Sequence, residues 1–291
     1  MNRAVRRVAV TGLGAFSPGG AGMAALQGWA RGGMSTPGLV PDFDAAAHIR
    51  NPRRLRTMHR TFQLASAAAV MAMEAAGWSA NGGLEAMGVA PERAGLATAL
   101  ADISPVTADL LRVLAAVQPE MGREPDGWAR FAELGARELH PFRRLALLAN
   151  MAAGHTSLLL GMQGPGFCFT SGAGGGMQAI TESYWTVAEG RAELMLAQSA
   201  SSPEQAYTSE RLPEISGAVV LEAWEAAEGR GARVLAEIVA GGEGMPPPPA
   251  GMEPAPELLA ALLRLGGGGQ VELSALARAA AAQTALVEAR R

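Results

Sequence analysis

The sequence predicts an α/β protein built on a mainly buried sheet. Short apolar runs that are bounded by glycine or polar residues alternate with longer Ala-rich segments of helical pattern. Residues 95–100, 192–197 and 216–222 are mostly apolar and include runs of successive apolar side chains, such as LMLA and AVVL, as strands covered on both faces do. With 291 residues, 49% of them hydrophobic and 18% charged, the chain can bury a sizeable core.

The elements follow in a regular order along the chain. We expect strands at residues 8–10, 95–100, 167–169, 192–197, 216–222 and 233–240, the first of them ending in a glycine turn at 11–14. Helices are predicted at 62–76, at 109–138 with an interruption at 119–127, at 145–160 and at 176–189.

The composition changes after Gly241. Residues 243–257 are rich in Pro and Gly and predict a linker. Residues 258–291 predict a short tail of two helices, separated by the glycines at 266–269. We therefore expect one domain over 1–242, a linker over 243–257 and a helical tail over 258–291.

Bulk properties exclude several classes of function. The single cysteine, Cys168, allows no intrachain disulfide, and the net charge of −3 favours no contact with nucleic acid. No apolar run reaches the length of about 18 residues that a membrane span needs, so we expect a cytoplasmic protein without a membrane partner. The basic residues are all Arg, which excludes a lysine-dependent mechanism. The four histidines stand singly, as capping or surface residues rather than metal ligands, and no metal or other cofactor is expected (His48, His59, His140 and His155).

Residues 164–180 read GPGFCFTSGAGGGMQAI, a pattern of strand, tight turn and helix. Such a turn often exposes a nucleophile or cradles a phosphate. A dinucleotide fingerprint is disfavoured because the next predicted strand, 192–197, does not end in a carboxylate. A hydrolase elbow is disfavoured because it needs glycine two residues before and after the serine, where Ser171 has Phe169 and Ala173. Cys168 lies between two Phe residues, so we expect it to be buried with a raised pKa, and both it and Ser171 to be structural.

An arginine-rich segment precedes the first long helix. Five arginines occur within eleven residues: Arg50, Arg53, Arg54, Arg56 and Arg60. One interpretation is a solvated approach to the helix. The other is a docking patch for an acidic or phosphorylated partner.

Five segments, in order, resemble one known family, the β-ketoacyl-ACP synthases of the thiolase fold. The opening Arg6–Gly14 with Ser17–Pro18 is similar to the family's first strand and turn. The others are Met58–Ala65, similar to M-D-R-F-T-Q-L-A; Asn150–Ser157, similar to N-M-A-A-G-H-I-S; Gly190–Ala197, similar to G-x-A-D-V-M-L-A; and Gly217–Glu222 with Gly229–Arg233. The resemblance covers residues 6 to about 242 and implies a thiolase-like fold, a mainly buried mixed sheet flanked by helices, with the second half truncated.

The departures from the family carry the functional expectation. A gapless match to the family's T-A-C-A-S places its nucleophilic cysteine at Ala173, where no side chain can form a thioester. No histidine follows His155, so the resemblance implies that the family's two catalytic histidines are not supplied in cis. We therefore expect no catalytic residue in this chain and no independent condensing activity.

The resemblance also suggests a role. Chain-length factors of type II polyketide and aryl-polyene systems resemble ketosynthases, lack the thiol and pair with an active ketosynthase. For this chain it implies a heterodimer with a full-length ketosynthase in polyketide, aryl-polyene or fatty-acid-like elongation, and indirect contact with acyl carrier protein. The alternative is a carrier-dependent acyltransferase or thioesterase that uses Ser171 or Cys168.

The resemblance assigns these roles to particular residues. The strand Phe167, Cys168, Phe169 and Thr170 would form the dimer contact. The turn Ser171, Gly172, Ala173, Gly174, Gly175 and Gly176 would line the acyl tunnel. Arg53, Arg54, Arg56 and Arg60 would form a docking patch for carrier protein.

Overall fold

The computed structural model describes residues 5–32, 38–100, 105–119, 126–139, 148–170, 172, 175–202, 213–240, 255–272 and 275–276. The protein is an α/β protein, and one mixed sheet runs through it in the order β4-β3-β5-β6-β1-β7-β8, with β2 paired to β1. The strands are β1 Val8–Ser17, β2 Gly20–Ala21, β3 Ala94–Leu100, β4 Gly166–Phe169, β5 Leu194–Ser201, β6 Ile215–Ala223, β7 Ala236–Val239 and β8 Gln270–Glu272.

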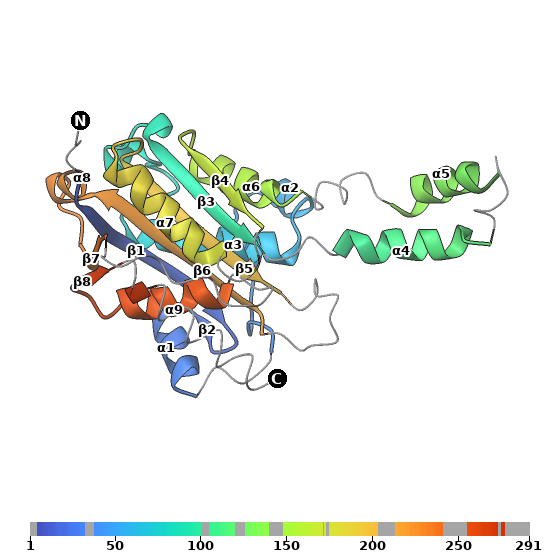
Figure 1. The fold of residues 1–291 in the computed structure, drawn as a ribbon, viewed down its shortest axis with the longest axis horizontal. Coiled ribbons are helices and arrows are strands. Elements are labelled where there is room, and N and C mark those ends of the chain that lie inside the picture. Colours follow the sequence, from blue (N-terminus) through green and yellow to red (C-terminus); the bar gives the residue numbers. More distant parts are fainter. Residues whose placement is uncertain are drawn as a thin grey trace.

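The helices match the predicted ones closely where the apolar period is strong. They are α1 Met23–Arg31, α2 Pro52–Leu55, α3 Arg60–Ala75, α4 Pro105–Val117, α5 Asp126–Glu138, α6 Asn150–Leu160, α7 Gly175–Ala188, α8 Trp224–Gly229 and α9 Ala255–Leu265. The predicted interruption at 119–127 separates α4 from α5. These two helices pack against each other and project from the body of the protein (Figure 1).

The central strands are buried along their whole length. Strands β4, β3 and β5 are parallel to one another, whereas β6 runs antiparallel to both β5 and β1. Every residue of β1, β3, β5 and β6 is buried, because helices cover both faces of the sheet.

Two helical layers enclose the sheet. Helices α7 and α9 lie in front of the strands in Figure 1 and contribute Ile180, Tyr184 and Leu262 to one core cluster. Helices α3 and α6 cover the opposite face, where Leu64, Met73 and other side chains form a second cluster. The sheet thus separates two hydrophobic cores, and Phe167 and Phe169 of β4 pack into the one that α7 covers.

The predicted glycine turn at 11–14 is wrong, because β1 continues to Ser17. Helix α3 crosses β1 so closely that a Cβ atom at Gly12 would lie 2.0 Å from the Ala72 carbonyl oxygen. A Cβ atom at Gly14 would lie 2.2 Å from the Ala68 carbonyl oxygen. The two glycines therefore serve close packing of a strand against a helix.

The tail departs from the two predicted helices. Helix α9 packs against α7 and the sheet, but the glycines at 266–269 lead into β8, which pairs in parallel with β7. A predicted helix becomes a strand here because β7 presents an edge that β8 completes. Residues 243–254 of the predicted linker and the end of the tail, 277–291, lie outside the described residues, whereas the last residues of the predicted linker, 255–257, begin α9.

Candidate functional site

The connection from β4 to α7 forms the predicted strand, turn and helix. Gly172 has a φ of +66°, a conformation that glycine adopts without steric cost. Its carbonyl oxygen accepts a hydrogen bond of 3.0 Å from the amide of Gly175, the first residue of α7. Ser171, Ala173 and Gly174 lie outside the described residues. The described residues thus include β4, which leads into the turn, and α7, which follows it.

The first turn of α7 is held firmly in the core. Gly175, Gly176 and Met177 are buried, as is most of the helix behind them. A helix N-terminus carries a partial positive charge and unpaired amide groups, which stabilise a thiolate. The helix N-terminus that would stabilise the thiolate of a nucleophilic cysteine is therefore present, but residue 173 is alanine.

Strand β4 lies at one edge of the sheet, and β8 lies at the other. It pairs in parallel with β3, with Thr98 opposite Cys168, and within the described residues no strand pairs with its other edge. Phe167 and Phe169 point to the α7 side, where their rings stack with centroids 6.5 Å apart. An edge that combines unpaired backbone groups with a pair of aromatic rings can accept another strand.

The predicted burial of Cys168 is wrong, because the side chain is exposed. The residue lies on the edge strand, on the face opposite the two Phe rings, and Thr170 beyond it is exposed too. Partial removal from water nevertheless raises the pKa of the Cys168 thiol, as we expected. The thiol is accessible, but it is held in its protonated, weakly nucleophilic form.

The predicted docking arginines differ in their exposure and in their partners. Arg53 and Arg56 are exposed, whereas Arg54 is half-buried. Arg60 binds the buried Glu214 through Nε and Nη2, at 2.6 and 2.8 Å. Its guanidinium thus anchors the start of α3 to the segment before β6. No local pattern around Glu214 in the sequence marks it as the partner of Arg60.

The expected surface position of His155 is also wrong. We expected a capping or surface residue, but His155 is buried against Phe62, with ring centroids 6.2 Å apart. Burial lowers the pKa of His155, and the charge of Arg54 lowers it further. Burial also lowers the pKa of His48. His140 lies outside the described residues.

A buried polar network connects the sheet to α3 and α6. The amide of Gln198 on β5 donates to Thr98 Oγ1 at 2.9 Å and to Thr156 Oγ1 at 3.1 Å. Thr156 Oγ1 in turn lies 2.9 Å from Ser66 Oγ. Gln198 follows the predicted strand 192–197 directly, which is the one signal that the sequence offered for this network.

Two searches of the described part of the chain were negative. No group of three or more His, Cys, Asp or Glu side chains there is arranged to hold a metal ion. No helix among the described residues has the length and hydropathy needed to cross a membrane.

Curated relatives of this chain include a 3-oxoacyl-(acyl-carrier-protein) synthase and a putative polyketide β-ketoacyl synthase. A 3-oxoacyl-(acyl-carrier-protein) synthase 2 of Vibrio harveyi is 26% identical over 279 residues, covering 80% of this chain and 62% of the relative. A putative polyketide β-ketoacyl synthase 1 of Streptomyces halstedii is 27% identical and covers 68% and 47%. The chain therefore spans about half to three fifths of the length of these relatives.

Solved structures of similar fold cover nearly the whole chain. The ishigamide ketosynthase/chain length factor aligns with a TM-score of 0.63 and 19% identity, covering 98% of this chain and 86% of that one. A type II polyketide acyl-carrier protein in complex with its ketosynthase aligns with a TM-score of 0.65 and 18% identity, covering 98% and 92%. At such identities the likeness shows a shared, thiolase-like fold.

The family follows from a direct match. The model of the β-ketoacyl synthase N-terminal domain matches residues 30–216, which include β3 to β5, the turn before α7 and the start of β6. This span holds three of the resembling segments, Met58–Ala65, Asn150–Ser157 and Gly190–Ala197. The chain belongs to the β-ketoacyl synthase family.

Proposed function

We propose that this chain is a ketosynthase-like subunit that does not condense acyl chains itself and pairs with an active β-ketoacyl synthase. The observation that carries the proposal is Ala173, at the position where the family resemblance places the nucleophilic cysteine. Condensation requires a thiolate that forms a thioester with the acyl chain, and a methyl group cannot do this. The subunit would act in polyketide, aryl-polyene or fatty-acid-like chain elongation.

The edge strand β4 supports pairing with another subunit. Soluble proteins usually protect a sheet edge, because its unpaired backbone groups attract other strands. Here the edge carries the stacked Phe167 and Phe169 and the exposed Cys168. A partner strand along β4 would satisfy the backbone groups and remove both rings from water. We therefore place the ketosynthase partner on Phe167–Thr170.

The known relatives are consistent with such an assembly. One of the similar solved structures is described as a ketosynthase/chain length factor, and another as a ketosynthase complexed with an acyl-carrier protein. By analogy, the turn from Ser171 to Gly176 would face the acyl tunnel of the partner. Arg53 and Arg56, which are exposed, would attract an acidic carrier protein, while Arg60 serves the ion pair with Glu214.

The enzymatic alternative, an acyltransferase or thioesterase, has weaker support. It would need an activated nucleophile, with Cys168 or Ser171 as the candidates. The pKa of the Cys168 thiol is raised, so little thiolate forms at neutral pH. This is the opposite of the environment in which catalytic cysteines are found.

Co-expression with a ketosynthase that has its catalytic cysteine tests the proposal. We expect a stable heterodimer by size-exclusion chromatography with light scattering. Phe169→Asp should abolish it by placing a charge at the strand edge, whereas Val5→Asp, at an exposed site three residues before β1, should not. Ala173→Phe should shorten the product, because the larger side chain would occupy part of the acyl tunnel.

Two results would refute the proposal. One is a well-behaved monomer that no ketosynthase accompanies through purification. The other is acylation of the purified chain alone by acyl-ACP, detected by intact mass, which would favour the enzymatic alternative. Peptide mapping of the acylated residue would then identify Cys168 or Ser171 as its nucleophile.

A further inference from the structure

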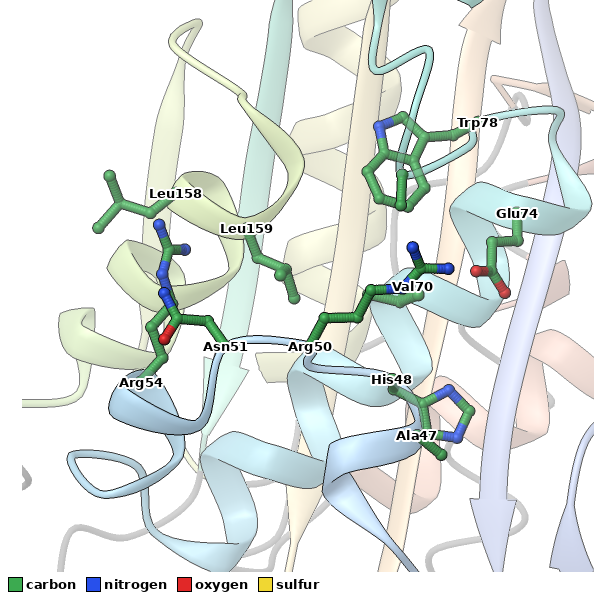
Figure 2. A pocket seen from close by; sticks show the side chains of 11 residues that line it. Ala47, His48, Arg50, Asn51, Arg54, Val70, Glu74, Trp78, Leu158 and Leu159 are labelled. Atoms are coloured by element: carbon green, nitrogen blue, oxygen red, sulfur yellow. The ribbon is translucent and has the colours of Figure 1, made fainter.

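A pocket of about 300 Å³ opens on the α3 and α6 side of the sheet. It is formed by the segment that leads into α2, the C-terminal half of α3, the loop after α3 and the end of α6 (Figure 2). Its apolar wall consists of Val70, Trp78, Leu158 and Leu159. Helix α7 lies on the other face of the sheet, so this pocket is separate from an acyl tunnel at the start of that helix.

The charged groups of the pocket favour an anion. Arg50 and Arg54 line it together with one carboxylate, that of Glu74. His48 also lines it. Burial lowers the pKa of His48 and favours the neutral imidazole, so this residue adds no charge to the pocket. In the view of Figure 2, Arg50 extends toward the side of Glu74 and Arg54 toward the side of Leu158.

Both guanidinium groups lack a partner within the described residues, where neither Arg50 nor Arg54 forms an ion pair. The contrast with other arginines is clear, since Arg60 and Arg230 each hold a buried carboxylate through two nitrogens. Nη1 of Arg54 is buried and has no hydrogen-bond acceptor. A buried donor without an acceptor is costly, and turning this guanidinium toward an anion would break no hydrogen bond of Nη1.

The apolar wall sets the second requirement for a ligand. Leu158 is 69% exposed, although it is a large aliphatic side chain on a folded helix. With the indole of Trp78 and the side chain of Val70, it offers a surface for a hydrocarbon body of modest size. Small-molecule sites combine such walls with a few polar groups that orient the ligand.

We propose that this pocket binds a small organic anion that carries a carboxylate or phosphate head and an apolar tail. The head binds the guanidinium of Arg54, toward which the exposed side chain of Arg50 can turn, and the tail lies against Trp78, Leu158 and Leu159. Guanidinium groups suit both heads because they donate two parallel hydrogen bonds. The inference is independent of the proposed pairing with a ketosynthase.

Isothermal titration of the full chain tests the site with defined probes. Octanoate and octyl phosphate separate the two heads, acetate and inorganic phosphate remove the tail, and octylamine reverses the charge. We expect at least one octyl anion to bind about tenfold or more tightly than its tail-free counterpart, with no binding of octylamine. The preferred head identifies the ligand class as carboxylate or phosphate.

Point variants locate the binding. Arg54→Gln and Arg50→Gln should each weaken it by about tenfold, the loss of a charge-assisted hydrogen bond. Glu74→Gln should strengthen it by removing the competing carboxylate. Arg53→Gln is the matched control, since Arg53 is an exposed arginine on the same short helix that does not line the pocket.

Several outcomes would overturn the site. They are no binding of either octyl anion, equal binding of the tail-free probes, or an equal effect of Arg53→Gln and Arg54→Gln. Circular dichroism checks that each variant is folded. If Arg54→Gln is not folded, Arg50→Gln and Leu158→Ser decide, because both side chains reach solvent and either substitution should weaken binding.

Discussion

Arg60, the first residue of α3, forms a bidentate ion pair with Glu214, which lies directly before β6. The carboxylate is completely buried and also accepts hydrogen bonds from the amide of Val40 and the hydroxyl of Ser202. One buried charge thus joins four segments that are far apart in the sequence. A buried carboxylate needs its cation, because an unpaired charge in the interior is very costly.

Removing this cation should destabilise the protein strongly. We expect Arg60→Met to lower the free energy of unfolding by about 3 kcal/mol, the lower end of the range for breaking a buried pair, since Arg60 itself reaches solvent. The double variant Arg60→Met/Glu214→Gln should recover part of the loss, because it removes the unpaired charge while the amide oxygen can still accept from Val40 and Ser202. Urea unfolding followed by circular dichroism measures both, with Arg53→Met as the control. Equal effects of Arg53→Met and Arg60→Met would contradict the role of the pair.

Gly14 should tolerate no side chain. A Cβ atom there would lie 2.2 Å from the carbonyl oxygen of Ala68, a backbone atom that cannot move without shifting α3. Gly14→Ala should therefore cost about 3 kcal/mol, at the upper end for overpacking a core. Gly28→Ala is the matched control, because Gly28 is exposed within α1 and an added Cβ atom meets nothing within 4 Å.

The control substitution has a predicted sign of its own. Alanine in place of an exposed helical glycine reduces the conformational entropy of the unfolded chain, so Gly28→Ala should raise stability by up to about 1 kcal/mol. Thermal unfolding of the two variants compares them directly. A mild effect of Gly14→Ala would mean that β1 and α3 lie further apart than described.

A cysteine at position 173 should be more reactive than the native Cys168. It would lie just before α7, whose N-terminus favours a thiolate, whereas the pKa of Cys168 is raised by its loss of contact with water. We expect Cys168→Ser/Ala173→Cys to react with iodoacetamide at neutral pH about tenfold faster than the native chain, a factor that one unit of thiol pKa provides. Intact-mass kinetics measure both rates. Equal rates would show that the turn does not present residue 173 to the helix end.

Stability should fall on mild acidification because of His155. Burial, and then the charge of Arg54, lower the pKa of this imidazole from its ordinary value of 6.5. Above this value both the folded and the unfolded chain hold it neutral. As the pH falls below 6.5, the unfolded chain takes up a proton that the folded chain refuses, so stability declines until the lowered pKa is reached.

This pH effect is measurable by urea unfolding between about pH 7.5 and pH 5, with a loss of at most about 1.4 kcal/mol per pH unit from one proton. His155→Phe removes this titrating group and should reduce the decline, leaving the part that His48 contributes; the site can take the ring because it already packs against Phe62. An unchanged slope in that variant would assign the decline to other groups.

Much of the fold could be predicted from the sequence because its signals are local. The apolar runs predicted β3, β5 and β6 within a few residues, and the Ala-rich periodicity predicted α3 and α7. The family motifs added the thiolase-like arrangement, to which the similar structures conform. The expected strand, turn and helix around Ala173 formed for the same reason, since glycine, apolar runs and helical period occupy one continuous segment.

What failed were inferences that depend on neighbours in space. Cys168 was expected to be buried because it lies between two Phe residues, yet β4 is the edge strand and leaves the thiol exposed. Gly12 and Gly14 indicated a turn, yet they mark the crossing of α3 over β1. His155 looked like a surface residue because no local pattern showed that Phe62 would cover it.

The sequence by itself determined the family, the order of strands and helices and the alanine at position 173. Only the tertiary structure decided that β4 lies at an edge of the sheet and that Arg60 neutralises Glu214. It also decided that Arg50 and Arg54 line one pocket while neither forms an ion pair within the described residues. The physical reason is that strand and helix formation depend on side chains a few residues apart. Burial, ion pairing and cavities depend on segments that meet only when the chain has folded.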